Sequence, residues 1–374
     1  MKINQMNFIY LTSKKYPSKT ADHFFVMEMA QAYGRLLKDK LTLVLAGDTS
    51  DFFKDIKVVN TEILNERGRT PYYFFWLPYF IMKQKLNNSE TVFFSNDPNL
   101  LVDLVVLRKI FRFKYKICSE WHMLYDSWKD AYIVKNSDCL VATSKRLRDT
   151  ILDRTKVSID PDKFLVVYGG ANIEKYDKLE GRDLRTELNL PKDKILVAYI
   201  GMFKTLGTTK GIDMMIESLS YLPDNVNMVF VGGKHEEIDD IKKEIVDPKI
   251  KERVIFVERQ DMERVPMYQK AIDILVIPSP DKPPFSNYLL PMKVYEYIAS
   301  CKPVVFSDLP ILQEILGDCG FSFKPGDAKD LARVILFING DPEFVRQKTE
   351  MCYQKAKEST WDRRAQNIID FLAK

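Results

Sequence analysis

Several features that often direct a search for function are scarce or missing in this sequence. Its five cysteines form no C-x-x-C pair, are odd in number and stand mostly inside apolar runs, a pattern typical of buried free thiols in a reducing compartment. The sequence has no run of eighteen apolar residues, and the apolar stretch near its N-terminus is too short for a secretion signal. These absences argue against secretion and membrane spanning, and they predict a cytoplasmic protein.

The sequence also lacks low-complexity segments and a strong excess of one charge. Charged residues make up 29% of the chain with both signs mixed, and the formal net charge of +4 is too small to indicate a nucleic-acid partner. The charge is nevertheless uneven, because residues 1–175 hold 27 basic and 20 acidic side chains, whereas the remainder holds 29 and 32. We infer that the first part faces an anionic partner, such as membrane phospholipid or a ligand that carries phosphate.

What the sequence does contain is a regular alternation of short apolar segments with amphipathic ones. Segments rich in Val, Ile, Phe and Tyr have the length and composition of buried strands, and they lie at residues 6–12, 41–46, 91–95, 115–120, 138–144 and 164–170. Residues 22–39 show apolar positions at spacings of three and four, which predicts a helix. Alternating strands and helices predict a parallel sheet with helices on both faces.

A charged stretch interrupts the alternation near residues 170–190, and a second series of strands begins at residue 195. At 374 residues the chain exceeds what one hydrophobic core usually organises. We therefore predict two α/β domains, with residues 1–175 in the first and 176–360 in the second. Sheets of this kind bind ligands outside the carboxyl ends of their strands, so the expected site is the cleft between the domains. Residues 361–374 predict a final helix with no strand after it.

The second domain has glycine and polar residues at the ends of its predicted strands. One strand ends at Gly201, and Lys210 stands where the next helix is expected to open. Backbone N–H groups at a helix start, helped by a lysine, can bind phosphate, although a glycine after a strand often merely ends it. Another strand end is followed by His235 beside two glutamates, which we interpret as a solvated helix start without a catalytic role.

The stretch NYLLPMKVYEYIASCKPVVFSDLP, residues 287–310, is more specific. Lys293 and Glu296 stand one helical turn apart after a proline-stiffened loop, with Pro291 at the expected start of the helix. On a solvated face such a pair is a surface ion pair worth roughly 0.2–0.5 kcal/mol. After a rigid loop, the helix start instead presents unpaired N–H donors to an anionic ligand, with both side chains on nearly the same face.

This stretch, with P-x-K-x-x-E-Y before a small-residue helix and KPVV, resembles the donor-binding signature of family 4 retaining glycosyltransferases of the GT-B architecture. Further segments match the family in order along the chain: EWHML, VATSKRLRDTI, VVYGGANIEKYD, IGMFKTLGTTKGID and YQKAIDILVIPS. The resemblance implies two Rossmann-like domains that face each other across a donor-binding cleft, with a C-terminal helix that crosses back to the first domain. It also implies retention of configuration at the anomeric carbon of the sugar.

The resemblance implies roles for individual residues. Glu296 matches the family glutamate that accepts hydrogen bonds from both ribose hydroxyls, and Lys210 matches the lysine at the donor diphosphate, whose charge offsets that of the departing nucleotide. His122 matches a histidine near the sugar and the acceptor; by itself it would be interpreted as a loop histidine. These three residues form the predicted catalytic set. The predicted donor-binding set comprises Gly201, Lys204, Lys210, Ser286, Asn287, Tyr288, Leu289, Leu290, Lys293 and Glu296.

Two departures from the family pattern concern the sugar end of the donor. The family commonly has arginine after the glycine of this strand, where this chain has Met202, and Lys204 is the candidate to supply the charge. The first glutamate of the family's paired-glutamate motif falls on Tyr288. Ser286, Asn287 and the backbone amides of residues 286–290 then remain as candidate donors to the sugar nucleotide.

The first domain holds two basic segments with open interpretations. Ser18, Lys19 and Thr20 precede a helix in a lysine-rich loop. This segment is either an exposed basic loop or a site for phosphate of the donor or of a lipid-linked acceptor. Residues 67–86 gather Trp, Tyr and Phe between basic flanks, as an interfacial membrane helix does. A core helix is also expected there, and burial is the favoured interpretation.

The sequence thus predicts a metal-independent glycosyltransferase of hexosyl type that moves a sugar from a UDP- or GDP-linked donor to a saccharide or lipid-linked acceptor, in cell-surface glycan biosynthesis. No D-x-D motif of the metal-binding kind is recognised, and no cofactor is expected beyond the nucleotide sugar as co-substrate. An anionic membrane surface on the cytoplasmic side is a further candidate partner, and nucleic acid is not. The alternatives are a sugar-nucleotide epimerase of the same architecture, or a catalytically weakened partner that binds nucleotide or membrane and docks another transferase.

Overall fold

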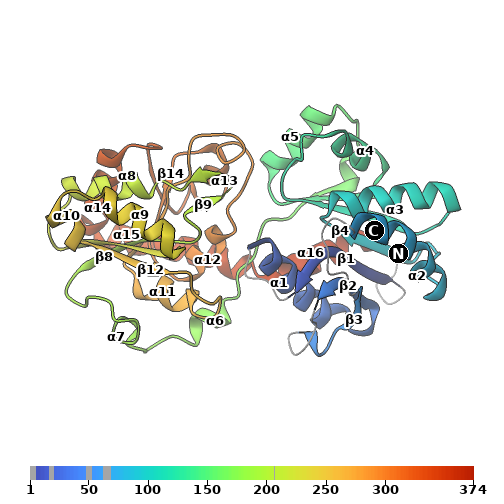
Figure 1. The fold of residues 1–374 in the computed structure, drawn as a ribbon, viewed down its shortest axis with the longest axis horizontal. Helices are drawn as coiled ribbons and strands as arrows, with labels where there is room; N and C mark the ends of the chain where they lie inside the picture. The colour runs from blue at the N-terminus through green and yellow to red at the C-terminus, as the bar shows by residue number, and fades with distance from the viewer. Residues whose placement is uncertain (1–5, 17–20, 48–52, 62–68, 206) are drawn as a thin grey trace. The chain divides into compact units, whose positions relative to one another are not determined.

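The computed structural model describes residues 6–16, 21–47, 53–61, 69–205 and 207–374. The chain divides into two compact units (Figure 1): the first comprises residues 1–169 and 361–374, and the second comprises residues 170–360. The boundary between them lies at Gly169, whereas the sequence predicted it at residue 175. The final helix, α16 (Trp361–Ala373), is part of the first unit, which is the position that the resemblance implied.

Within the described residues of the first unit, the strands form one parallel sheet in the order β3-β2-β1-β4-β5-β6-β7. They are β1 (Asn7–Tyr16), β2 (Leu41–Gly47), β3 (Lys57–Asn60), β4 (Thr91–Ser95), β5 (Lys116–Trp121), β6 (Cys139–Ala142) and β7 (Phe164–Val166). The apolar segments had predicted all of these strands except β3. The sequence did not predict β3, because this strand is short, lies at the edge of the sheet and is exposed at both ends.

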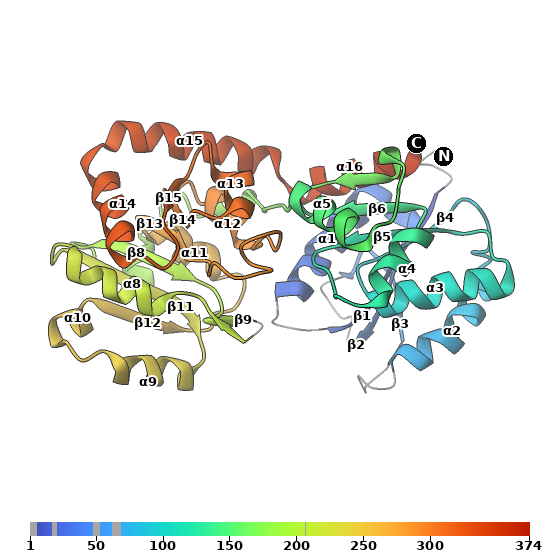
Figure 2. The same cartoon turned by 90° about the horizontal axis from the view of Figure 1, so that it is seen from above.

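Helices connect the strands of the first unit: α1 (Ala21–Leu37), α2 (Arg69–Lys83), α3 (Pro98–Phe111), α4 (Trp128–Asn136) and α5 (Lys145–Thr155), with short 3₁₀ turns at Lys38–Lys40 and Pro161–Lys163. Local sequence explains several starts. The carboxylate of Asp97, for example, accepts from the N–H groups of Asn99 and Leu100 at 2.9 and 3.3 Å and caps α3. Figures 1 and 2 show α16 beside α1, where the Trp361 ring lies 5.3 Å from that of Phe25.

One stripe of α2 is buried and another is exposed. Tyr73, Leu77 and Ile81 have no exposed surface, so the core helix that was favoured for residues 67–86 describes this stripe. Phe75 on the same helix is 77% exposed. The two interpretations of the segment therefore apply to different sides of one helix.

The described strands of the second unit form another parallel sheet, in the order β12-β11-β8-β13-β14-β15. They are β8 (Ile195–Ile200), β11 (Val226–Gly233), β12 (Val254–Glu258), β13 (Ile274–Ile277), β14 (Val304–Ser307) and β15 (Phe321–Phe323), and a separate hairpin pairs β9 (Lys204–Thr205) with β10 (Thr208–Thr209). The helical segments are α6 (Glu174–Asp177), α7 (Leu184–Glu187), α8 (Ile212–Ser218), η6 (Leu219–Tyr221), α9 (His235–Glu244), α10 (Pro248–Glu252), α11 (Val265–Ala271), α12 (Lys293–Ala299), α13 (Pro310–Leu316), α14 (Ala328–Gly340) and α15 (Pro342–Glu358).

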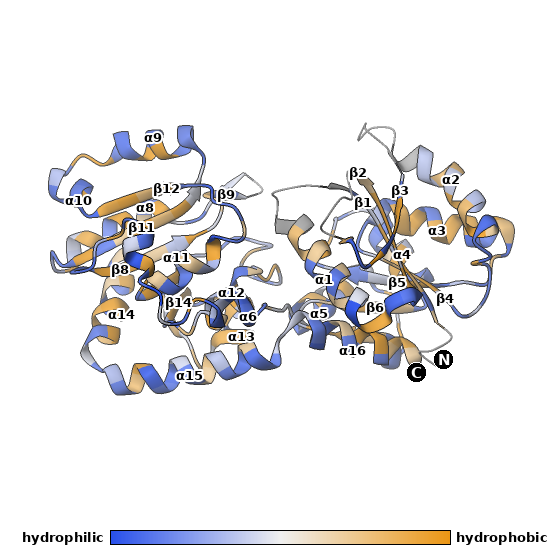
Figure 3. Ribbon diagram, turned by 90° about the horizontal axis from the view of Figure 1, so that it is seen from below, coloured by the Kyte–Doolittle hydropathy of each residue, from blue (hydrophilic) through white to orange (hydrophobic). Residues whose placement is uncertain are grey.

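Figure 3 shows apolar strands inside each unit and polar residues along the outer helices. Runs such as the buried residues of β8 and β13 are continuous rather than alternating, because helices cover both faces of a parallel sheet. Among the described residues, no helix combines the length and the apolar character needed to cross a bilayer.

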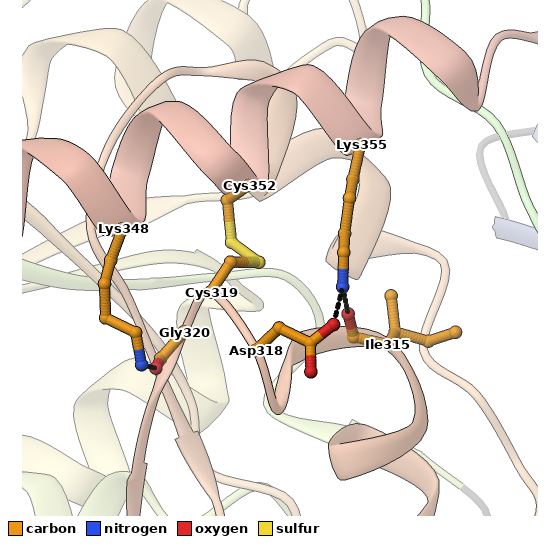
Figure 4. The surroundings of a disulfide bond; sticks show 7 residues. All are labelled: Ile315, Asp318, Cys319, Gly320, Lys348, Cys352 and Lys355. Atoms are coloured by element: carbon orange, nitrogen blue, oxygen red, sulfur yellow. Dashed lines mark hydrogen bonds and ion pairs between the residues drawn. A yellow bond between two sulfur atoms is a disulfide. The ribbon is translucent and has the colours of Figure 1, made fainter.

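The structure corrects the prediction that the cysteines are free thiols. Cys319 and Cys352 are joined in a disulfide although 33 residues separate them (Figure 4). Cys352 lies on α15, and Lys348 and Lys355 of the same helix each donate to a backbone carbonyl near Cys319 at 3.1 Å. This docking of α15 brings the two thiols together, which their spacing in the sequence does not reveal. Cysteine usage therefore no longer supports a reducing compartment. The free cysteines are Cys118, Cys139 and Cys301.

Candidate functional site

Three neighbouring strands of the second unit, β11, β8 and β13, end at the same edge of the sheet. Two glycines let their ends approach closely. Gly201 after β8 has a φ of 147°, and Gly232 in β11 has a φ of 116°, values that side chains rarely allow. A Cβ atom on Gly232 would lie 2.6 Å from the carbonyl oxygen of Gly201. Glycine at both positions therefore lets the ends of β8 and β11 lie close together, and it leaves the backbone there without side chains that would cover it from a ligand.

The ammonium group of Lys293 fills the end of β8. It donates to the carbonyl of Ile200 at 2.9 Å and lies 3.7 Å from the centre of the Tyr199 ring. A Cβ atom on Gly201 would collide with this ammonium. Lys293 thus points into the strand ends rather than along a solvated helix face, and the surface ion pair considered from the sequence is not what the structure contains.

Lys210 approaches the same place from the segment after the β9–β10 hairpin. Its ammonium lies 3.7 Å from the centre of the Phe285 ring, and burial lowers its pKa to about 8. Burial also lowers the pKa of Lys293 to about 7; the charge of Lys210 lowers it further, and that of Glu296 raises it. The predicted residues Gly201, Lys210 and Lys293 are therefore brought together.

Glu296, one turn beyond Lys293 on α12, is held by a short chain of polar groups. The amide of Gln269 donates to its carboxylate at 3.5 Å, and the Tyr176 hydroxyl donates to the other end of that amide at 2.6 Å. The pKa of Tyr176 is raised well above its usual value, first by burial and then by the charge of Glu296. Sequence reasoning missed Gln269 and Tyr176, because each lies far from Glu296 in the chain and belongs to an ordinary-looking helix.

Tyr297 was also missed, although it follows Glu296 directly in the quoted motif. Its hydroxyl accepts from the N–H of Ile200 at 2.8 Å and lies 3.2 Å from the carbonyl of the same residue. Tyr297 has no exposed surface. It joins α12 to the end of β8 and so helps to fix the positions of Lys293 and Glu296, which precede it in the same helix.

The loop before α12 is arranged differently from the prediction. The N–H groups of residues 286–289, which were predicted as donors to the ligand, donate instead to the carbonyls of Lys282 and Pro284 at 3.0–3.3 Å. The N–H groups of Val294 and Tyr295 likewise donate to Pro291 and Met292. Two positive groups at this edge are the side chains of Lys210 and Lys293.

The remaining donor-binding residues of the prediction occupy varied environments. Ser286 and Tyr288 are buried, with 4% and 2% exposure, while Asn287 is exposed. Leu289 and Leu290 are partly buried. Lys204 is exposed on β9 opposite Thr209, in a hairpin where the sequence had indicated only a loop. Lys204 therefore lies on a strand of the hairpin, whereas Lys210 lies in the segment after it.

His122 lies in the first unit, after β5, next to a buried ion pair. Its Nε2 is 3.6 Å from the carboxylate of Glu120, and its ring meets that of Phe25 edge to face at 4.3 Å. Glu120 also accepts from Arg364 of α16 at 2.5 Å. Burial alone would raise the pKa of Glu120, but the charge of Arg364 and then the neighbouring His122 outweigh it, so that pKa is lowered. Ser18, Lys19 and Thr20 lie outside the described residues.

The sequence of the second unit is similar to that of known proteins. Residues 180–359 match the sequence model of the family described as "Glycosyl transferases group 1". The D-inositol 3-phosphate glycosyltransferase of Mycobacteroides abscessus is 26% identical over 39% of this chain and 33% of its own length. The O-antigen chain mannosyltransferase RfbU of Salmonella typhimurium is 23% identical over 57% of this chain and 54% of its own length. The matched regions thus span about a third to a half of these relatives.

A solved structure extends the likeness in fold to nearly the whole chain. Anabaena Alr3699/HepE, in complex with UDP and glucose, has a TM-score of 0.72 and 19% sequence identity, and the match covers 98% of this chain and 99% of that one. Each unit of this chain is a Rossmann-like parallel sheet with helices on its faces. By sequence, residues 180–359 of this chain are similar to group 1 glycosyl transferases, and by fold nearly the whole chain is similar to structures of the GT-B architecture.

Proposed function

We propose that this chain is a retaining glycosyltransferase that moves a sugar from a UDP- or GDP-linked donor to a saccharide or lipid-linked acceptor in glycan biosynthesis. One observation carries the proposal. The unit that matches group 1 glycosyl transferases holds Lys210 and Lys293 at the end of β8 with pKa values lowered to about 8 and about 7. Two partly desolvated ammonium groups at one strand edge favour an anionic ligand, and a nucleoside diphosphate is such a ligand.

The same two groups suit the chemistry of transfer. In the proposed reaction the bond between the anomeric carbon and the diphosphate breaks, and the acceptor hydroxyl bonds to the same face of the sugar. Negative charge then builds on the departing diphosphate, where Lys210 and Lys293 stabilise it. Because two side-chain charges already serve this purpose, the proposal requires no metal ion.

In this proposal the other predicted residues bind different parts of the substrates. The carboxylate of Glu296 accepts hydrogen bonds from both ribose hydroxyls, since a carboxylate has acceptors only and can serve two donors. Gln269 holds that carboxylate in place. His122 contributes from the first unit to the sugar or the acceptor, and the ion pair of Glu120 with Arg364 orients its surroundings.

Calorimetric titration of the purified chain with UDP, GDP and ADP tests the proposal directly. We expect one of the first two to bind with a dissociation constant on the order of micromolar to millimolar. The titration is followed by measurement of nucleotide release from UDP- and GDP-linked sugars with saccharide acceptors. Failure of all three nucleotides to bind contradicts the proposal.

Met202 and Tyr288, where the family pattern has charged residues, favour one second candidate, a nucleotide-binding partner with weak or no turnover. The release assay separates the two functions. A transferase releases nucleotide only when an acceptor accepts the sugar, whereas a binding partner retains affinity without release. An epimerase would instead convert the sugar nucleotide without any acceptor.

A further inference from the structure

One side of the first unit carries large apolar side chains that face solvent. On α2, the side chains of Tyr72, Phe75, Tyr79 and Met82 are 39, 77, 60 and 62% exposed. Their spacing of three, four and three residues places them on a single stripe of the helix. The stripe lies opposite the one that packs into the core.

The end of the neighbouring helix α3 adds two exposed apolar side chains. Ile110 and Phe111, the last residues of α3, are 61 and 51% exposed. The helices α2 and α3 pack against each other, and Figures 1 and 2 both show them side by side. The N–H of Lys114 after α3 donates to the side chain of Asn87 after α2 at 2.7 Å, so the two helices end next to each other. We call Tyr72, Phe75, Tyr79, Met82, Ile110 and Phe111 the α2–α3 face.

The charges around the α2–α3 face are almost all positive. The exposed basic residues at the two helix ends are Lys83, Lys85, Lys109, Arg112 and Lys114. Residues 72–90 contain one acidic residue, Glu90, and residues 104–116 contain none. The apolar side chains are therefore rimmed mainly by positive charge.

We propose that the α2–α3 face docks on the surface of an anionic phospholipid bilayer, with its apolar side chains at the acyl boundary and its basic side chains at the lipid phosphates. Large exposed apolar patches mark interaction surfaces. Aromatic side chains beside lysines suit the bilayer interface, where an apolar body meets a polar, negatively charged layer. A mainly positive rim complements a continuous sheet of negative charge, whereas a protein partner would usually present both signs.

Arg108 is close in sequence to the rim but does not belong to it. Its guanidinium donates to the carboxylate of Asp138, to the carbonyl of Asn136 at 2.5 Å and to that of Tyr115 at 3.3 Å. Replacing Arg108 would disturb these tertiary contacts, so a loss of membrane binding in such a variant would be ambiguous. The test therefore uses only exposed residues.

Co-sedimentation of the full chain with vesicles tests the proposal. One set of vesicles contains phosphatidylglycerol and phosphatidylcholine in equal parts, and the other contains phosphatidylcholine alone. The basic variant replaces Lys83, Lys85, Arg112 and Lys114 with Gln. Each charge near an anionic surface strengthens partition about fivefold, so this variant, which lacks four charges, should lose on the order of 1,000-fold in binding to the anionic vesicles. High salt should weaken the parental chain similarly.

The control for charge replaces Lys242, Lys243, Lys249 and Lys251 with Gln. These lysines are exposed in the second unit, so this variant has the same net charge as the basic variant and should bind anionic vesicles as the parental chain does. Equal losses in both variants would overturn the proposal, because net charge alone would then explain the binding.

The apolar variant changes Phe75, Tyr79 and Phe111 to Ser, and its control changes the exposed Phe337 and Met351 of the second unit to Ser. We expect at least a tenfold loss of vesicle binding only in the first. Parental binding by the apolar variant would refute docking through this face. Light scattering of the parental chain and the apolar variant without lipid tests whether a second copy of the chain occupies the face instead. A dimer that the apolar variant abolishes would assign the face to that second copy and overturn the proposal.

A positive signal completes the test without relying on loss of binding. Phe75→Trp places a reporter at the most exposed position of the α2–α3 face, and Phe337→Trp places one in the second unit. Brominated lipids in the anionic vesicles should quench the added fluorescence of the first reporter and leave that of the second unchanged. Equal quenching of both reporters, or none of either, contradicts the proposed orientation.

Discussion

The two units place charged side chains at the end of a central strand, yet they balance those charges differently. In the first unit, Glu120 of β5 meets Arg364 at 2.5 Å, and the two side chains are 0 and 1% exposed. In the second unit, the ammonium of Lys293 at the end of β8 interacts electrostatically with the ammonium of Lys210 and with the carboxylate of Glu296. The charges of the first unit are compensated inside the folded chain, whereas those of the second unit retain an excess of positive charge.

This difference separates charge that supports the fold from charge that awaits a ligand. A buried pair that is complete in the folded chain contributes to stability only as a whole, and removal of one partner leaves the other uncompensated. Burial, and then the charge of Lys210, lowers the pKa of Lys293, and a bound anion would raise that pKa again. Variants of the first site should therefore change unfolding, and variants of the second should change binding.

The largest effect is expected for Arg364→Met. This change leaves the Glu120 carboxylate buried without its main partner, which should destabilise the first unit by about 3–5 kcal/mol. All four tryptophans, at positions 76, 121, 128 and 361, lie in the first unit, so their fluorescence during urea unfolding reports on that unit. The exposed neighbour Arg363→Met is the control and should change stability by less than about 0.5 kcal/mol.

A double variant sharpens the same comparison. Glu120→Gln combined with Arg364→Met removes both charges, and it should be less destabilised than Arg364→Met alone because no unpaired charge remains. Equal stability of Arg364→Met and the parental chain would show that the pair is not the structural element described above.

Next in size is the effect of Glu296→Gln on nucleotide affinity. Replacing a charged acceptor of the ribose hydroxyls should cost about 1.5–3 kcal/mol, or roughly tenfold to a hundredfold in the dissociation constant of UDP or GDP. The exposed Glu263→Gln is the matched control. Calorimetry measures both, after circular dichroism confirms folding. Parental affinity and turnover in a folded Glu296→Gln would remove the ribose role from this residue.

Asp103 is an exception to this compensation within the first unit, and its effect on stability is expected to be smaller. Burial, and then the charge of Asp97, raises the pKa of Asp103 on α3 to about 7. The folded chain then binds more protons than the unfolded chain between about pH 4 and pH 7, so stability falls as the pH rises through that range. Asp103→Asn should remove this loss and stabilise the first unit at pH 8 by on the order of 2 kcal/mol.

Urea unfolding of the first unit at pH 5 and pH 8, followed by tryptophan fluorescence, measures the effect of Asp103→Asn. The exposed Asp55→Asn in the same unit is the control and should leave the pH dependence unchanged. An Asp103→Asn variant with the parental pH dependence would show that Asp103 is not an uncompensated buried charge.

Sequence alone predicted the parts of the fold that depend on local pattern. The strands of both sheets, except β3, stand where continuous apolar runs predicted them, since helices bury both faces of such strands. The β9–β10 hairpin was missed because it has only two residues in each strand. The Cys319–Cys352 disulfide was missed because it depends on the docking of α15.

The candidate site shows the same limit. Lys210, Lys293 and Glu296 were selected from the sequence, and the structure brings them to one strand edge. Sequence did not show where the ammonium of Lys293 points, since that depends on the contact between Gly201 and α12. Nor did it show that Gln269 supports Glu296 across 27 residues of chain. Contacts between distant segments supply the geometry that residue types alone do not fix.

The last and smallest effect is the uptake of protons when nucleotide binds to the second unit. With pKa values of about 8 for Lys210 and about 7 for Lys293, the free site at pH 8 lacks between one and one and a half protons, roughly, that an anionic ligand would restore. The phosphates of UDP are already ionised at that pH. Affinity should therefore weaken as the pH rises above about 7, and calorimetry in buffers of different ionisation enthalpy should count about one proton taken up per nucleotide. Lys293→Met should reduce the uptake to about half a proton, because Lys210 alone would then respond. The exposed Lys329→Met is its control and should leave the uptake unchanged. Tight binding without proton uptake would mean that the two lysines are charged in the free chain or do not meet the diphosphate, and it would erase the contrast between the two units.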